Sequence, residues 1–359
     1  MAKYSWLGPW RSTVRNLLFR TLRDALQTDD GRRILADVLD GVFERPQTGL
    51  TFPEDPYGDL ARSGGARPVI APVFITGRFR SGSTLLWNIF RNVPSCTAFY
   101  EPLNERRWFD ASWRGERVDP THRGIDEYWR EYAGLVHLGN YYMEDWIRRR
   151  LYMAPDAWDP RLEAYVQALI DSAAHRAVLQ FNRVDFRLPW LRQVFPHARY
   201  LHIYRHPRDQ WVSTLMDATT FPRDGSIEEF ASHDHFYLLS WARDLSYVFS
   251  FLDPQAADHP YELFYLIWKL SYSFGRRYCH LSFAYETLCD QPHVEVPRIM
   301  NAAEVEDYDL DRLVRLVEPY QRKWQQYADQ EWFAEREAKC EAVLARYLGT
   351  RSGDVNDRK

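Results

Sequence analysis

Residues 69–88 read VIAPVFITGRFRSGSTLLWN, and this stretch decides the fold. Its first part, 69–76, is a continuous apolar run, which predicts a strand buried on both faces of a parallel sheet. From Thr84 onward the apolar side chains follow helical spacing, so the glycine-containing segment 77–83 lies between a strand and the start of a helix. A strand that leads through a glycine turn into a helix favours an α/β protein.

The same alternation continues along the chain, where apolar runs predict further strands and helical spacing predicts long helices. The predicted strands are 177–181, 199–204 and 279–285, and the predicted helices are 227–252, 261–274 and 332–348. Strands that alternate with helices indicate a P-loop-type fold of three layers around a central, mostly parallel sheet.

We expect this α/β domain to occupy residues 67–350, with a helical insertion at 105–175 and a disordered tail at 351–359. Residues 1–66 are expected to form a helical extension followed by a linker rich in proline and glycine. Residues 10–26 have the spacing of an amphipathic helix with arginines on its polar side. Such a helix either packs on the main body or makes a peripheral contact with a membrane or a lipid-like substrate.

The composition excludes several classes of protein. The 46 basic and 50 acidic residues among 359 give a formal charge of −4, which argues against a general nucleic-acid binder. The longest apolar runs are interrupted well before the ~20 residues that a bilayer span needs. The four cysteines lack the spacing of a zinc site or a disulfide framework, and basic residues recur through the N-terminal stretch, so we expect a cytoplasmic protein without an export signal.

The segment 77–84, GRFRSGST, has the G-x-x-x-x-G frame of a phosphate-binding loop. Ser83 stands where a nucleotide triphosphatase would carry its lysine. A glycine turn that enters a helix directs backbone N–H groups and the positive helix end at one anion, and the Ser and Thr hydroxyls add donors. Arg80 adds a fixed positive charge. We therefore predict an anion-binding loop, against the alternative of an ordinary strand-to-helix turn.

A second group of residues follows the predicted strand 199–204, in the sequence RHPRDQWVS (205–213). Pro207 begins a turn and Asp209 is a plausible helix cap, so Ser213 lies about one turn inside the helix on a side that can face Arg205. An arginine offers planar two-point contact with phosphate oxygens. The pair predicts a second phosphate site, although a strand-end arginine alone commonly pairs with a nearby carboxylate such as Asp209.

Together these motifs resemble the family of sulfotransferases that use 3′-phosphoadenosine 5′-phosphosulfate (PAPS), in the branch whose first loop reads G-x-x-R-S-G-[ST]-[ST]-L. The resemblance extends over roughly 70–350. Its motifs are PVFITGRFRSGSTLL from residue 72, FYEPL at 99–103, FPHARYLHIYRHPRDQWVS at 195–213 and FAYETL at 283–288. The arginine at position 80 is the form found in the carbohydrate and tyrosylprotein branches.

The resemblance implies a role for each position of the motifs. The 5′-phosphosulfate would be held by Arg80, Ser81, Gly82, Ser83 and Thr84, and the 3′-phosphate by Arg205 and Ser213, with Tyr285 near the adenine. No magnesium is needed, because the transferred sulfuryl group carries less charge than a phosphoryl group. The acceptor hydroxyl attacks sulfur in line, and Arg80 and the loop amides stabilise the charge that develops on the bridging oxygen.

Glu101 in FYEPL is the expected general base that removes the acceptor proton, because it matches the glutamate of the same two branches. A chain that runs along the helix after the loop, turns at Pro94 and returns would bring Glu101 back near the loop. The alternatives are a surface or salt-bridged glutamate in this position, and His202 or His206 as the base. His202 lies in a predicted buried strand, and His206 lies inside the second phosphate site.

The sequence does not identify the acceptor, and we rank a carbohydrate, a glycolipid or a small hydroxylated metabolite above a protein tyrosine. Two other functions fit the sequence less well. A P-loop kinase acting on a small molecule would need a triphosphate lysine and a magnesium carboxylate, which Ser83 and the strand ends do not supply. A catalytically idle nucleotide-binding scaffold would not need Arg80, Glu101, Arg205 and Ser213 together.

Overall fold

The computed structural model describes residues 70–119, 122, 124–217 and 219–353. The helix and linker that the sequence predicts for 1–66 lie outside these residues, as does most of the predicted tail. The part of the chain from Ile70 onward forms one compact unit.

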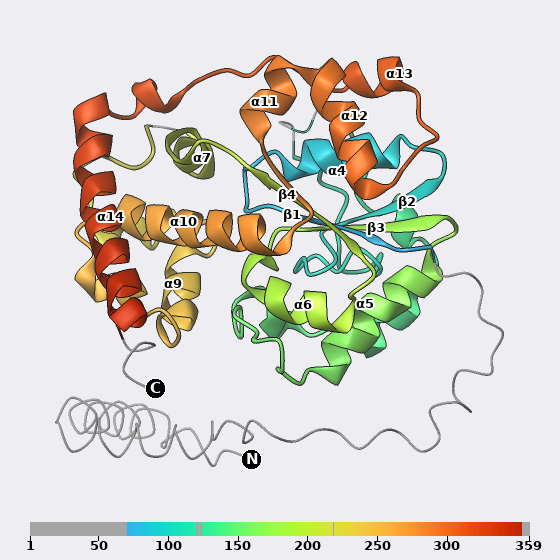
Figure 1. Ribbon diagram of the computed structural model, residues 1–359, viewed down its shortest axis with the longest axis horizontal. Helices are drawn as coiled ribbons and strands as arrows, with labels where there is room; N and C mark the ends of the chain where they lie inside the picture. The colour runs from blue at the N-terminus through green and yellow to red at the C-terminus, as the bar shows by residue number, and fades with distance from the viewer. Residues whose placement is uncertain (1–69, 120–121, 123, 218, 354–359) are drawn as a thin grey trace, which may run out of the picture. The chain divides into compact units, whose positions relative to one another are not determined.

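A five-stranded parallel sheet in the order β2-β3-β1-β4-β5 forms the centre of this unit (Figure 1). The strands are β1 (Val73–Thr76), β2 (Cys96–Tyr100), β3 (Arg176–Phe181), β4 (Arg199–Tyr204) and β5 (Leu281–Ala284). At the carboxyl end of β1, Thr76 is paired with Phe181 of β3 and His202 of β4. The predicted α/β class with a parallel central sheet is confirmed.

Helices cover both faces of the sheet, which gives the three layers that the sequence predicts (Figure 1). One face carries α4 (Ser83–Arg91), α11 (Tyr285–Asp290), α12 (Pro292–Ala303) and α13 (Leu310–Val314). The other face carries α5 (Pro160–Ser172) and α6 (Leu188–Val194), and α10 (Pro260–Tyr278) packs on β4, β5 and α6. Every residue of β1 is buried because helices lie above and below it.

A second apolar core lies beside the sheet, around α7 (Pro207–Thr214), α8 (Ile227–Phe230), α9 (Leu238–Ser246), α10 and α14 (Gln330–Gly353). Its centre is Trp211 of α7, which is fully buried and packs edge-on against Tyr261 of α10. Trp241 and Phe333 bring α9 and α14 into the same cluster. The α7 segment is therefore held between the sheet and this second core.

Several boundaries differ from the sequence prediction. The first strand begins at Val73, and the last strand ends at Ala284, so that Tyr285 opens α11. The helix predicted for 227–252 is two helices, because the Asp234 carboxylate accepts the N–H groups of Leu238 and Leu239 and starts α9 anew. A 3-10 turn, Ser250–Leu252, follows α9.

The region 105–175, predicted as a helical insertion, contains one α-helix among its described residues, α5. Its other regular elements are the 3-10 turns Arg130–Tyr132, Val136–Asn140 and Glu144–Ile147. Aromatic side chains hold these turns, such as Tyr132, whose hydroxyl donates to the carbonyl of Tyr100 (2.9 Å). Strand β2, which precedes Glu101, was not predicted from the sequence.

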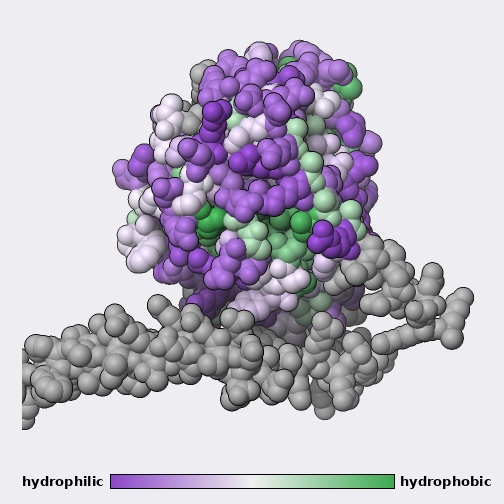
Figure 2. All heavy atoms as spheres, turned by 90° about the vertical axis from the view of Figure 1, so that its left-hand side faces the viewer, coloured by the Kyte–Doolittle hydropathy of each residue, from purple (hydrophilic) through white to green (hydrophobic). Residues whose placement is uncertain are grey.

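The face on the side of α14 and α9 is mainly hydrophilic, with a narrow apolar band across its middle (Figure 2). Of the helices in the described part of the chain, none is both long enough and apolar enough to cross a membrane.

Candidate active site

The residues that the sequence predicts for the site follow the carboxyl ends of strands. Segment 77–82 follows β1, Glu101 follows β2, Arg205 follows β4 and Tyr285 follows β5. Because the strands are parallel, these ends lie on one edge of the sheet. The connection from β1 leads to β2 on one side, whereas the connection from its neighbour β4 leads to β5 on the other, and such points form crevices in open α/β sheets.

The loop after β1 is compact, and neither Gly77 nor Gly82 has space for a side chain. A side chain at Gly77 would lie 2.7 Å from the carbonyl oxygen of Ile203. Gly82 has a φ of 95°, and a Cβ there would lie 2.2 Å from the ring of Tyr285. The loop therefore enters α4 with its backbone close against β4 and α11.

Arg80 connects the two predicted phosphate sites. Its Nε donates to Ser213 Oγ (2.9 Å), and its carbonyl oxygen accepts from Arg205 Nη1 (3.4 Å). Its Nη1 also lies 3.2 Å from the Asp119 carboxylate, which comes from the region 105–175. The structure thus brings Arg80, Arg205 and Ser213 together, and it adds an acidic neighbour that the sequence analysis did not anticipate.

Arg205 lies between two tyrosine rings. Its Cζ is 5.3 Å from the ring centroid of Tyr285 and 5.7 Å from that of Tyr320, in the range of cation–π contact. Its Nε is buried without a hydrogen-bond partner among the described residues. Tyr285 therefore contacts both Gly82 and Arg205, and Arg205 keeps a donor that an anion can accept.

The other loop residues take up different positions. Ser81 and Ser83 are buried, and Ser81 Oγ has no partner within the described part of the chain. Thr84 Oγ1 lies 3.1 Å from the hydroxyl of Tyr100 at the end of β2. This contact joins the loop to the strand that carries Glu101.

Glu101 is buried and accepts several hydrogen bonds. Asn104 and Asn182 each donate a side-chain N–H to its carboxylate over 2.5 Å, and Arg183 Nη1 lies 3.4 Å from it. Arg183 also binds Glu105 (2.7 Å). These donors fix the orientation of the carboxylate. The alternative of a surface position does not fit this burial, although the ion pair with Arg183 does match a salt-bridged glutamate.

Sequence reasoning missed Asn182 and Arg183 as neighbours of Glu101. They directly follow β3, at the same edge of the sheet as the loop and Glu101. A polar Asn-Arg pair at the end of an apolar strand was the available signal, because the strand ends of a parallel sheet meet there.

The competing residues are placed as follows. His202 is buried and pairs with Ser282 Oγ (2.8 Å), as expected of a core histidine, and burial lowers its pKa to about 4. His206 is the N-cap residue of α7, so Asp209 does not cap that helix. Asp209 instead accepts hydrogen bonds from the hydroxyl of Tyr320 and from the N–H groups of Lys323 and Trp324. Within the described residues it forms no ion pair with Arg205.

α7 is also braced by α14. Arg208 binds Glu337 through two N–H groups, at 2.8 and 2.7 Å, and its guanidinium lies over the rings of Trp324 and Phe333. Together with the contacts of Asp209, these interactions hold α7, the helix that carries Ser213, in place.

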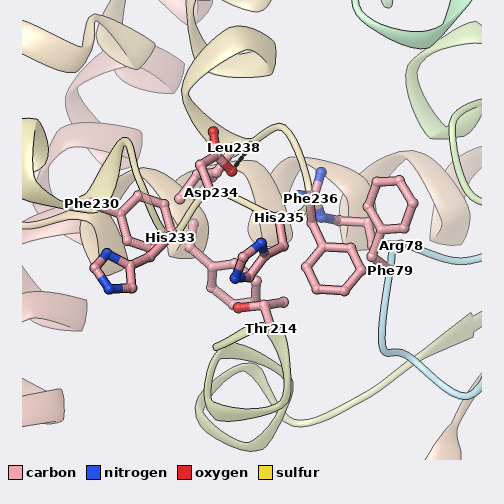
Figure 3. A pocket seen from close by; sticks show the side chains of 10 residues that line it. Arg78, Phe79, Thr214, Phe230, His233, Asp234, His235, Phe236 and Leu238 are labelled. Carbon is pink, nitrogen blue, oxygen red and sulfur yellow. Dashed lines mark hydrogen bonds between the residues drawn. The ribbon is translucent and has the colours of Figure 1, made fainter. Parts of the chain in front are cut away.

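A hollow of about 320 Å³, partly open to solvent, lies beside the loop (Figure 3). Arg78 and Phe79 form one side of it, and Phe230 and His233 form the other (Figure 3). Burial lowers the pKa of Arg78 to about 10, so its guanidinium is charged at neutral pH. Within the described residues no group of three or more His, Cys, Asp and Glu side chains is arranged to hold a metal ion.

Comparisons with known proteins agree with the motifs. A model of the sulfotransferase family matches residues 72–309. Among solved structures, the chain is similar to sulfotransferase STF9 from Mycobacterium avium, with 16% identity over 90% of this chain and 86% of that chain and a TM-score of 0.42. It is also similar to a sulfotransferase from Alicyclobacillus acidocaldarius, with 16% identity over 79% of this chain and 97% of that chain and a TM-score of 0.36. No curated protein sequence matches it.

Proposed function

The chain belongs to the sulfotransferase family, and from this premise we propose that it transfers the sulfuryl group of PAPS to a hydroxyl group of a carbohydrate, a glycolipid or a small metabolite. The observation that carries the proposal is the convergence of Arg80, Arg205 and Ser213 at the carboxyl ends of β1 and β4. Two guanidinium groups, a serine and the start of α4 meet there, which suits a donor with two phosphate-type groups.

The residues present fit this donor. Within the described chain, Arg205 has a buried N–H group without a hydrogen-bond partner, and Ser81 has a buried hydroxyl group without one. A side chain at Gly82 would collide with the Tyr285 ring, so glycine at this position allows Tyr285 to pack against the loop backbone. In the proposal Ser81, Gly82, Ser83 and Thr84 hold the 5′-phosphosulfate with Arg80, while Arg205 and Ser213 hold the 3′-phosphate and Tyr285 lies near the adenine.

Bound donor supplies the sulfuryl group, and the chain supplies charge and orientation. Arg80 stabilises the negative charge that grows on the bridging oxygen as the bond to sulfur breaks. This stabilisation needs no metal ion in the proposal, because the positive charge is built into the loop.

Glu101 takes the proton of the acceptor hydroxyl. Its two carboxylate oxygens accept hydrogen bonds from Asn104, Asn182 and Arg183, which hold the carboxylate in one orientation. Removing the proton as the oxygen attacks sulfur completes the transfer.

Ligand-dependent thermal stabilisation of the full chain tests the proposal. Adenosine 3′,5′-bisphosphate should raise the melting temperature in the presence of EDTA, because the donor site uses arginines and backbone N–H groups, whereas ATP should not. Arg205→Ala should weaken binding of the bisphosphate far more than binding of AMP, which lacks the 3′-phosphate. A preference for ATP with magnesium would favour a kinase, and equal losses for both ligands would remove the assignment of Arg205.

A further inference from the structure

Gln210 is a buried polar residue of α7 that the function described above leaves without a role. Its side chain is 1% exposed, and its Nε2 donates to the carbonyl oxygen of Phe79 over 2.8 Å. That carbonyl belongs to the peptide group between Phe79 and Arg80. The hydrogen bond therefore fixes the plane of the peptide that precedes the loop arginine.

Arg80 needs such support, because its backbone is in the left-handed region with a φ of 65°. This conformation is unfavourable for residues other than glycine. Arg205 Nη1 contacts the carbonyl oxygen of Arg80, on the other side of the same residue. The two peptide groups that flank Arg80 are thus both held by side chains from 205–210, and Ser213 holds its guanidinium.

Gln210 also lines a small polar hollow, together with Arg78 and Ser81. The hollow has about 170 Å³ of space free of atoms, part of it open to solvent. Four buried polar atoms among its lining residues have no hydrogen-bond partner within the described chain, namely Gln210 Oε1, Ser81 Oγ, and Nε and Nη1 of Arg78. Unpaired buried groups of this kind destabilise the folded state, so a partner for them is expected.

The chemistry of these atoms distinguishes a water molecule from an anion. Arg78 only donates, whereas Gln210 Oε1 only accepts, and a bound anion would face this oxygen without a donor between them. The carboxylate of Asp185, which accepts from Ser271 of the same hollow, adds to the repulsion. A water molecule can accept from Arg78 and donate to Gln210 and Ser81, which gives the three hydrogen bonds typical of buried water.

We propose that Gln210 is a positioning residue for Arg80: its Nε2 holds the Phe79–Arg80 peptide directly, and its Oε1 is tied to Arg78 and Ser81 through one buried water molecule. The inference rests on the proposed function, because it concerns the same donor loop. In this proposal α7 supports both phosphate sites, because Gln210 and Ser213 lie on one turn of that helix.

A double-mutant cycle tests the positioning role. The dissociation constant of adenosine 3′,5′-bisphosphate is measured by calorimetry for the full chain, Gln210→Met, Arg80→Ala and the double variant. Gln210→Met keeps the side-chain volume and should weaken binding about tenfold in the parent chain, but less than about twofold when Arg80 is already absent. Equal losses in both backgrounds would show a general effect on the fold and would overturn the role.

Thr214→Val is the matched control, because Thr214 is buried in the same helix and its hydroxyl donates to Trp211 within that helix (2.6 Å). It should leave bisphosphate binding unchanged. Amide hydrogen exchange without ligand gives a second readout, in which residues 78–82 should exchange at least about tenfold faster in Gln210→Met than in Thr214→Val. If the parent chain did not bind the bisphosphate, the proposed function would fail, and the exchange rates would still decide the role of Gln210.

A high-resolution crystal structure of the full chain tests the water molecule. One ordered peak between Arg78 and Gln210 is expected in native crystals, and a bromide soak should give no anomalous signal there. A bromide peak would identify an anion site instead. That result, or a direct contact of Arg78 with Gln210 Oε1, would overturn this half of the proposal.

Discussion

Arg80 and Glu101 have φ angles of 65° and 39°, so both side chains that the sequence predicts as catalytic extend from left-handed backbone. Strained residues of this kind persist where surrounding contacts determine them, and they cluster at active sites. The sequence predicted the two residues from motifs, and the structure supplies their partners. Asp119 could not be predicted as a partner of Arg80, because it lies 39 residues further along the chain and reaches Arg80 only when these segments pack together.

Asp119 yields a prediction about donor affinity. Its carboxylate lies 3.2 Å from Arg80 Nη1, where it competes with a negatively charged donor for the same guanidinium. Asp119→Asn is therefore expected to tighten binding of adenosine 3′,5′-bisphosphate about two- to tenfold at low salt, as measured by calorimetry. Glu144→Gln removes an exposed ion pair of the same 3.2 Å length with Arg107 and should change nothing. Unchanged or weaker binding for Asp119→Asn would contradict competition.

Glu101 yields a prediction about turnover. Glu101→Gln keeps the size of the side chain but removes its basicity, so bisphosphate binding should persist while turnover falls at least about a hundredfold. The measurement is the rate of sulfuryl transfer to an acceptor found by screening with labelled PAPS. Glu105→Gln also removes a carboxylate from Arg183 and is the control, for which most turnover should remain. Full activity of Glu101→Gln would reject this base.

At the scale of elements, the sequence predicted β3 and β4 within a residue, because fully buried strands are visible as apolar runs. β2 was missed, because CTAFY is short and contains polar residues, and its pairing with β3 makes it a strand. The break between α8 and α9 was also missed, although the polar run 232–235 was a signal for it. Apolar spacing continues across that break, and the contacts of Asp234 fix where α9 begins.

Gly82, where the loop enters α4, yields a prediction about stability and ligand binding. Gly82→Ala places a methyl group both at a φ of 95° and against the ring of Tyr285, so it should lower the free energy of unfolding by more than about 2 kcal/mol and abolish bisphosphate binding. Gly115→Ala is the matched control, because Gly115 has a φ of 63° but open space around it. It should cost about 1 kcal/mol. Urea unfolding that gave equal losses for both variants would exclude the steric effect of Tyr285.

At the scale of the whole molecule, buried histidines predict loss of stability in acid. Burial lowers the pKa of His202 to about 4 and that of His259 to about 3, whereas an unfolded histidine titrates near ~6.5. The unfolded state therefore binds more protons between these values, and stability that is present above pH ~6.5 is lost as the pH falls towards 4. Each residue should contribute about 1–3 kcal/mol to this loss.

Urea unfolding between pH 7 and 4.5 measures this effect. His259→Asn keeps an acceptor for the N–H group of Tyr261, which His259 Nδ1 now accepts over 3.0 Å, but it does not titrate. The variant should therefore lose less stability in acid than the parent chain. His197→Asn changes an exposed histidine and should keep the parent slope. An equal slope in the parent and His259→Asn would show that His259 does not contribute.

The bracing of α7 by Asp209 and Arg208 has a consequence for biosynthesis. Their partners lie at Lys323, Trp324 and Glu337, more than a hundred residues after Ser213 in translation order. A nascent chain on the ribosome has made Arg80 and Arg205 long before it has made the residues that hold α7 in place. The contacts that fix α7 therefore form late, after the segment through Glu337 has left the exit tunnel, and we expect a shorter polypeptide to lack them.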